Sequence, residues 1–385
     1  MSFNKIYPYG KQSISLKDIW EVIKVLKSDW LTQGPKVKEF EQAICDYVGA
    51  KYCIAVCNGT AALHLAVLSL GLQEVGEVIT TPNTFLATAN SILYSNSKIV
   101  FADIEQSTAN IDPKEIEKKI TQKTKGIIPV HFAGQSCDME KIVDIAKKHN
   151  LFVIEDAAHA IGSSYKGERV GSCKYSDLTI FSFHPVKTIT TGEGGAITTN
   201  NKDLYEKLLM LRTHGITKDP EKLTKNDGPW YYEQHVLGFN YRITDFACTL
   251  GILQLKRLDK FVKRRKEIVE IYRQEFADDD RFCLLQEKEY SKAAWHLCPL
   301  LINFEKVKTS KKELFEKLKE NGLNLQVHYI PVHLQPYYKN RFGFKDGDYP
   351  VAESYYKKTI SLPLYPDLKN SEVEKIVKIV KMITS

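Results

Sequence analysis

The chain has 385 residues, 43% of them hydrophobic and 26% charged, a composition that excludes fibrous and intrinsically disordered proteins. At this length we expect two domains with a core large enough to need no disulfide or structural metal. The net charge of +7 arises from 54 basic and 47 acidic residues spread along the chain, which argues against nucleic-acid binding and suits a small anionic substrate.

Strand and helix patterns alternate through the first two hundred residues. Short β-rich runs predict strands over residues 52–57, 77–82, 98–104, 126–132, 151–156, 177–183 and 194–200. Apolar residues at helical spacing predict helices over residues 37–48, 60–72, 84–95 and 137–150, and Asp112-Pro113 opens another. This alternation predicts an α/β layer with a mostly parallel sheet buried on both faces.

The pattern changes after residue 245. We expect one long amphipathic helix over residues 249–276. A smaller α+β unit follows, with strands expected over 298–304 and 324–330 and helices over 311–322 and 370–383. We therefore place a domain boundary near residue 255, between a large domain over residues 1–255 and a small C-terminal domain over residues 256–385.

Cysteine usage and the N-terminal sequence bear on the compartment. The eight cysteines form no CxxC pair and no cluster with zinc-ligand spacing, so we expect reduced thiols and no metal site. The first residues contain no apolar signal core, and no run reaches about 18 apolar residues. We expect a cytoplasmic protein with no membrane-spanning segment.

Three segments that follow predicted strands carry chemically useful groups. Asn58-Gly59-Thr60 joins a strand to a helix, where open amides and a hydroxyl can bind an anion, although an ordinary helix cap has the same pattern. Asp156 ends a strand, where a carboxylate can hold a metal, a ribose or a protonated ring nitrogen, or cap the next helix. Lys187 lies in a short loop after Ser182, where a desolvated amine can attack a carbonyl group, although a surface lysine is the alternative.

Taken together, these segments match the requirements of pyridoxal 5'-phosphate. The phosphate needs amides and hydroxyls, the pyridine nitrogen needs a carboxylate, and the aldehyde needs a lysine amine. The combination is more informative than any one segment.

From residue 30 to the last helix, the sequence resembles the DegT/DnrJ/EryC1/StrS family of sugar aminotransferases, which are fold-type I pyridoxal-phosphate enzymes. Within that family it is most similar to the enzymes of pseudaminic acid biosynthesis. The segments that carry this closer similarity are residues 28–35, 130–139, 181–195, 227–242 and 327–338. The resemblance implies a large domain with a mostly parallel seven-stranded sheet between helices and a smaller C-terminal α+β domain.

The resemblance also implies roles for single residues. Lys187 would bond to the cofactor aldehyde and transfer protons, Asp156 would pair with the pyridinium nitrogen, and His159 would lie near the ring oxygen. The other implied cofactor contacts are Thr60, Ala61 and Ser182 at the phosphate, Phe85 stacked on the ring and, from a neighbouring subunit, Asn240. The implied substrate contacts are Tyr9, Gln33, Arg242, His328, Tyr329 and His333.

The implied reaction moves an amino group from L-glutamate to C4 of a UDP-linked 4-keto-6-deoxy-N-acetyl hexosamine, in a homodimer with shared active sites. One alternative is a different acceptor, such as a 4-keto pentose or a dTDP-linked keto hexose. A sugar dehydratase of the same family would carry His in place of Lys187, and a non-catalytic cofactor-binding regulator could lose the acid–base residues that are present here.

Overall fold

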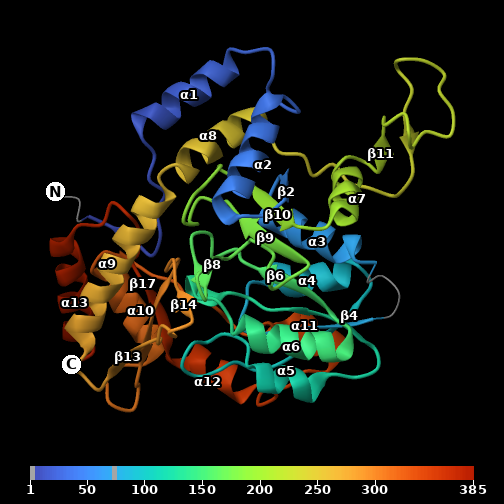
Figure 1. The fold of residues 1–385 in the computed structure, drawn as a ribbon. Helices are drawn as coiled ribbons and strands as arrows, with labels where there is room; N and C mark the ends of the chain where they lie inside the picture. Colours follow the sequence, from blue (N-terminus) through green and yellow to red (C-terminus); the bar gives the residue numbers. More distant parts are fainter. Residues whose placement is uncertain (1–4, 72–75) are drawn as a thin grey trace.

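A computed structural model of the chain describes residues 5–71 and 76–385. Its centre is a seven-stranded sheet with the strand order β2-β10-β9-β6-β5-β3-β4 (Figure 1). The strands are β2 (Tyr52–Val56), β3 (Glu77–Thr80), β4 (Lys98–Phe101), β5 (Thr124–Ile128), β6 (Phe152–Asp156), β9 (Leu178–Ser182) and β10 (Gly195–Thr199). Strand β10 runs antiparallel to both of its neighbours, and the other pairings in the sheet are parallel. The expected α/β class and mostly parallel sheet are confirmed.

Helices cover both faces of this sheet. One face packs against α3 (Gly59–Ser69), α4 (Leu86–Tyr94) and α7 (Lys202–Arg212). The other face packs against α2 (Pro35–Val48), α5 (Pro113–Lys119), α6 (Met139–His149) and α8 (Asp245–Leu255). Strand β2 shows how: Ile54 and Val56 belong to the first core, whereas Cys53 and Ala55 belong to the second, because alternate side chains point to opposite faces.

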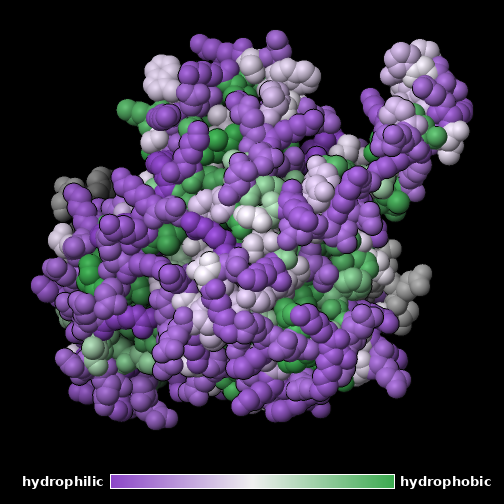
Figure 2. All heavy atoms as spheres, viewed as in Figure 1, coloured by the Kyte–Doolittle hydropathy of each residue, from purple (hydrophilic) through white to green (hydrophobic). Residues whose placement is uncertain are grey.

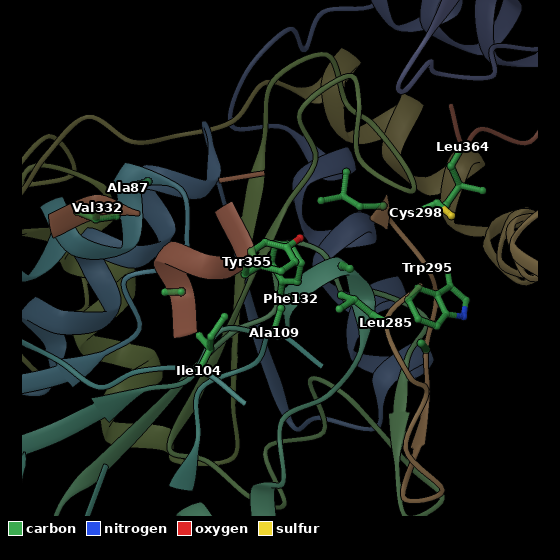
Figure 3. Close-up of a cluster of buried hydrophobic side chains, with 14 of the residues drawn as sticks. Ala87, Ile104, Ala109, Phe132, Leu285, Trp295, Cys298, Val332, Tyr355 and Leu364 are labelled. Carbon is green, nitrogen blue, oxygen red and sulfur yellow. The ribbon is translucent and has the colours of Figure 1, made fainter. Parts of the chain in front are cut away.

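The C-terminal part contains the antiparallel sheet β13 (Phe282–Leu284), β15 (Cys298–Ile302) and β17 (Thr359–Leu362). Its core includes residues of α9 (Leu258–Phe276), α10 (Lys311–Glu320), α12 (Pro350–Lys358) and α13 (Asn370–Ile383), while α11 (Pro336–Phe342) follows a 3-10 turn over Val332–Leu334. In the same hydrophobic cluster the rings of Phe132 and Tyr355 meet edge to face, 5.7 Å apart (Figure 3). The domain boundary near residue 255 stays a prediction.

Two sequence expectations about this part are wrong. The single helix expected over residues 249–276 is two helices, and at the break the Arg257 guanidinium binds the Asp18 carboxylate. The strand expected over 324–330 is reduced to β16 (Leu323–Asn324), because the next residues leave the sheet and carry His328 and Tyr329 to the cavity described below.

Shorter elements complete the structure. They are α1 (Leu16–Leu26), β1 (Tyr7–Pro8), β7 (Ser164–Tyr165), β8 (Glu168–Arg169), β11 (Ile216–Thr217), β12 (Glu233–Gln234), β14 (Ser291–Lys292) and a 3-10 turn over Phe132–Gly134. The hairpin formed by β11 and β12 belongs to an arm that projects away from the rest of the molecule (Figure 1). No helix in the described part of the chain is long and apolar enough to span a bilayer.

Candidate active site

A cavity of about 430 Å³ lies where β2, β6 and β9 end. The carboxyl ends of these parallel strands meet at one edge of the sheet, which is where ligands bind in open α/β folds. The residues predicted from the sequence that line it are Tyr9, Thr60, Phe85, Asp156, His159, Ser182, Lys187, His328 and Tyr329.

The N-terminus of α3 forms one wall of the cavity. Asn58 caps this helix, and its side-chain oxygen accepts a hydrogen bond of 2.8 Å from the amide of Ala61. The amides of Gly59 and Thr60, in the first turn, therefore remain for an anion. A Cβ atom at Gly59 would lie 2.9 Å from Ser182 Cβ, so glycine allows the helix to start close against β9. Ala61 is not placed as we expected, because its amide is already bonded and its side chain is buried outside the cavity.

Asp156 is buried at the end of β6 with its carboxylate fixed by two hydrogen bonds. The Thr88 hydroxyl donates to Oδ2 at 2.7 Å, and the Ala158 amide donates to Oδ1 at 3.1 Å. Thr84 in turn donates to Thr88 at 2.8 Å, since the Thr88 proton is already committed to Asp156. Burial raises the pKa of Asp156, and these hydrogen bonds together with the charge of Lys187 act against that rise.

Lys187 lies half-buried in the loop after β9 and faces the same cavity. Burial lowers its pKa to about 8, and the negative charge of Asp156 opposes this shift. Its amine has no hydrogen bond to any residue in the described part of the chain. A sizeable neutral fraction near neutral pH makes this amine able to attack a carbonyl group.

His159, Tyr329 and Phe85 form another wall. His159 Nε2 lies 3.0 Å from the Tyr329 hydroxyl, and burial holds the pKa of His159 well below its usual value, so the ring is neutral. Phe85 precedes α4 with 58% of its surface exposed, and its ring centroid is 6.1 Å from that of Tyr329. An exposed aromatic ring at the edge of a polar cavity is suited to stacking on a flat ligand.

Besides Ala61, four residues predicted from the sequence lie outside this cavity. Gln33 and Arg242 line a second pocket, of about 640 Å³. Asn240 is exposed and pairs through its backbone with Thr213. His333, expected to face substrate, is instead fully buried, with Nε2 3.0 Å from Glu353 Oε1.

Sequence reasoning missed several residues of the cavity wall. Those with polar side chains are Asn58 (recognised only as part of its motif), Thr84, Thr88, His184, Glu193 and His296. The four-residue spacing of Thr84 and Thr88 at a helix start could have suggested a shared direction. His296 follows no motif and gave no such signal. No group of His, Cys, Asp or Glu with the arrangement of a metal site exists among the described residues.

The comparisons with known proteins agree with this geometry. The sequence model of the DegT/DnrJ/EryC1/StrS aminotransferase family matches residues 12–381. The UDP-4-amino-4,6-dideoxy-N-acetyl-beta-L-altrosamine transaminase of Campylobacter jejuni is 43% identical over 373 residues, which cover 96% of this chain and 95% of the relative.

Two solved structures extend the comparison to the fold. PseC of Helicobacter pylori, an aminotransferase involved in pseudaminic acid biosynthesis, matches with a TM-score of 0.91 and 34% identity over 99% of both chains. The PLP form of Spr1654 from Streptococcus pneumoniae, described as a candidate sugar aminotransferase, matches with a TM-score of 0.91 and 32% identity over 98% of both chains.

Proposed function

The chain belongs to the DegT/DnrJ/EryC1/StrS aminotransferase family and is a pyridoxal-phosphate-dependent sugar aminotransferase, and we propose that it transfers the amino group of L-glutamate to C4 of a UDP-linked 4-keto-6-deoxy-N-acetyl hexosamine. The observation that carries the proposal is the convergence of Lys187, Asp156 and the start of α3 on one cavity. The choice of acceptor is supported by the name of the C. jejuni relative, which contains a UDP-linked amino sugar, and by the description of the H. pylori structure, which gives pseudaminic acid biosynthesis.

The residues present fit pyridoxal phosphate. The cradle between Gly59 and Ser182, which a Cβ atom would fill, and the unused amides of α3 suit the phosphate. The buried carboxylate of Asp156 suits a protonated ring nitrogen, and the unbonded amine of Lys187 suits an aldehyde. When bound, the cofactor supplies an aldehyde that takes up the amino group and a ring that delocalises electrons.

Each of these residues then has a defined task. Lys187 Nζ would hold the cofactor through its aldehyde and would carry a proton to and from the reacting carbon, a contribution of roughly 10²–10⁴-fold. Asp156 stays ionised to pair with the ring nitrogen, helped by the Thr88 hydroxyl. His159 and Tyr329, bonded to each other, would orient the ring oxygen of the cofactor and the bound sugar.

We further propose a homodimer in which Asn240 reaches the phosphate in the partner's cavity. Asn240 is exposed and does not line the cavity of its own chain. Asn240 directly follows the arm. On the arm, the large apolar side chains of Trp230 and Leu237 are 72% and 83% exposed, as expected of a surface that a partner covers. Figure 2 shows hydrophobic atoms on the arm and at its base. Arg242 and Gln33, in the second pocket beside this loop, would then meet the nucleotide diphosphate of the sugar bound in the partner.

The compartment is part of the same proposal. All eight cysteines are free, and seven of them are buried or half-buried. Free thiols in this number support a reducing compartment, for which we propose the cytoplasm.

A panel of acceptors tests the proposed function. The holoenzyme is incubated with L-glutamate and, separately, with UDP-linked, dTDP-linked and GDP-linked 4-keto-6-deoxy sugars and a UDP-linked 4-keto pentose, and 2-oxoglutarate and the aminated sugar are quantified. We expect the highest kcat/KM with the UDP-linked N-acetyl hexosamine. A higher value with any other acceptor would overturn the assignment of the sugar.

A further inference from the structure

Four histidines line the cavity, and they differ in their hydrogen bonds. His159 is bonded to Tyr329, His328 Nδ1 lies 2.7 Å from the Ser361 hydroxyl, and His184 accepts from the Val186 amide at 3.5 Å. His296 differs from the others because neither of its ring nitrogens has a hydrogen-bond partner among the described residues. The fully buried atom is Nδ1, whereas Nε2 is not fully enclosed by protein atoms and can therefore bond a ligand in the cavity.

The backbone holds His296 in place. Only 4% of the residue is exposed, its amide donates to Ala133 at 2.8 Å, and its carbonyl accepts from Arg265 at 3.2 Å. Trp295 and Ala133 both have left-handed backbone angles, with φ of 42° and 56°, and Trp295 packs in the same hydrophobic cluster as Phe132 (Figure 3). Such strain persists where the surrounding structure over-determines it, typically at functional sites.

The rest of the cavity wall offers few cationic groups to bind a carboxylate. Its described lining contains no arginine, and its one lysine is Lys187, which reacts. The hydroxyls of Thr88 and Tyr329 are already used by Asp156 and His159. His296 therefore offers a hydrogen-bonding side chain beside Lys187 that no protein group occupies.

We propose that His296 binds the α-carboxylate of the amino donor through its Nε2–H group. The inference rests on the proposed function, because it assumes an α-amino acid as donor. Burial and the nearby positive groups hold the pKa of His296 well below its usual value, so the ring is neutral and carries one proton. Since buried Nδ1 has no acceptor within reach, that proton belongs on Nε2.

The two half-reactions separate this role from a structural one. We compare the wild-type holoenzyme with His296→Leu, which removes the donor group, and His296→Gln, which keeps an N–H donor. The first half-reaction is followed by the absorbance change of the bound cofactor during titration with L-glutamate, without a sugar. In parallel, calorimetry measures the binding of glutarate, a dicarboxylate that cannot react.

For His296→Leu we expect the affinity for L-glutamate and for glutarate to fall roughly 10–100-fold. This is the effect expected from the loss of one hydrogen bond to a charged group. The amination of the keto sugar by the pyridoxamine form should change less than threefold, which also shows that the variant is folded. His296→Gln should recover part of the donor affinity. Equal losses in both half-reactions, or unchanged donor affinity, would overturn the inference alone. No response of the wild-type protein to L-glutamate would overturn the donor assignment and the inference with it.

Discussion

The Thr88 hydroxyl donates a hydrogen bond of 2.7 Å to Oδ2 of the buried Asp156 carboxylate. This contact joins α4 to the end of β6 and leaves the carboxylate with lone pairs directed toward the cavity. The protonation state of Asp156, the predicted partner of the cofactor ring, therefore depends on a residue 68 positions earlier in the sequence.

Replacing Thr88 by Val should therefore raise the pKa of Asp156 further. Burial raises this pKa, and the variant lacks one of the hydrogen bonds that lower it. In the proposed mechanism the ionised carboxylate is required and activity falls as the pH drops through this pKa, so the acid limb of the kcat profile should move to higher pH. We also expect a loss of roughly 1.5–3 kcal/mol in unfolding free energy. Thr88→Ser, which keeps the hydroxyl, serves as the control, and an unmoved acid limb in Thr88→Val would contradict the account.

If Lys187 attaches the cofactor as proposed, its pKa sets the pH dependence of that attachment. The neutral amine reacts with the aldehyde, so the rate at which the apoprotein acquires the visible band of the bound cofactor should rise with pH and reach its midpoint near pH 8. Asp156→Asn removes the charge that raises the pKa of Lys187, so its midpoint should lie at lower pH than in the wild-type protein. Stopped-flow absorbance measures both profiles, and a midpoint that moves upward would refute the electrostatic coupling.

A methyl group at position 59 should damage the anion cradle. Because a Cβ atom there would lie 2.9 Å from Ser182 Cβ, α3 and β9 must separate in Gly59→Ala. We expect roughly 10-fold weaker binding of pyridoxal phosphate, about the loss of one hydrogen bond. Gly10→Ala is the matched control, since its Cβ atom would meet Val186 at an ordinary 3.6 Å. Equal affinities of the two variants, measured by fluorescence titration, would argue against the cradle.

Complementation between subunits tests the shared site. A dimer that combines one Lys187→Ala subunit with one Asn240→Ala subunit contains one intact site if Asn240 acts in the partner, and none if it acts within its own chain. We therefore expect about half of the wild-type activity in the mixed dimer, well above either homodimer. Differently tagged subunits allow the mixed dimer to be purified. A mixed dimer without recovered activity would contradict the proposal that Asn240 acts in the partner's site.

The sequence was sufficient for the parts of the site that follow strands directly. Thr60, Asp156, Ser182 and Lys187 lie at or after strand ends, and parallel strands bring such positions together whatever the details of packing. Strand β10 was also predictable from its composition. Its antiparallel direction was not, because direction is defined only relative to β2 and β9, the strands with which it pairs.

What the sequence could not show are contacts that depend on loop geometry. His296 lines the cavity next to Trp295, and the backbone at Trp295 and Ala133 has left-handed angles. Alanine and tryptophan have no preference for such angles, so the sequence does not predict them. His333 is polar enough to contact a substrate, yet its imidazole is buried and bonded to the Glu353 carboxylate. At the break near Arg257, the guanidinium pairs with Asp18, a contact between residues that are distant in sequence.

The central claim is that Lys187 mediates transfer of nitrogen from L-glutamate to C4 of a UDP-linked keto sugar. The most direct measurement supplies L-glutamate with an isotopically labelled amino group and follows the label in the sugar product by NMR, for the wild-type protein and for Lys187→Ala. The account predicts labelled nitrogen bonded to C4 with the wild-type protein and none with Lys187→Ala, although that variant remains folded. Label transfer by Lys187→Ala, or a wild-type protein that transfers no label to this sugar, would contradict it.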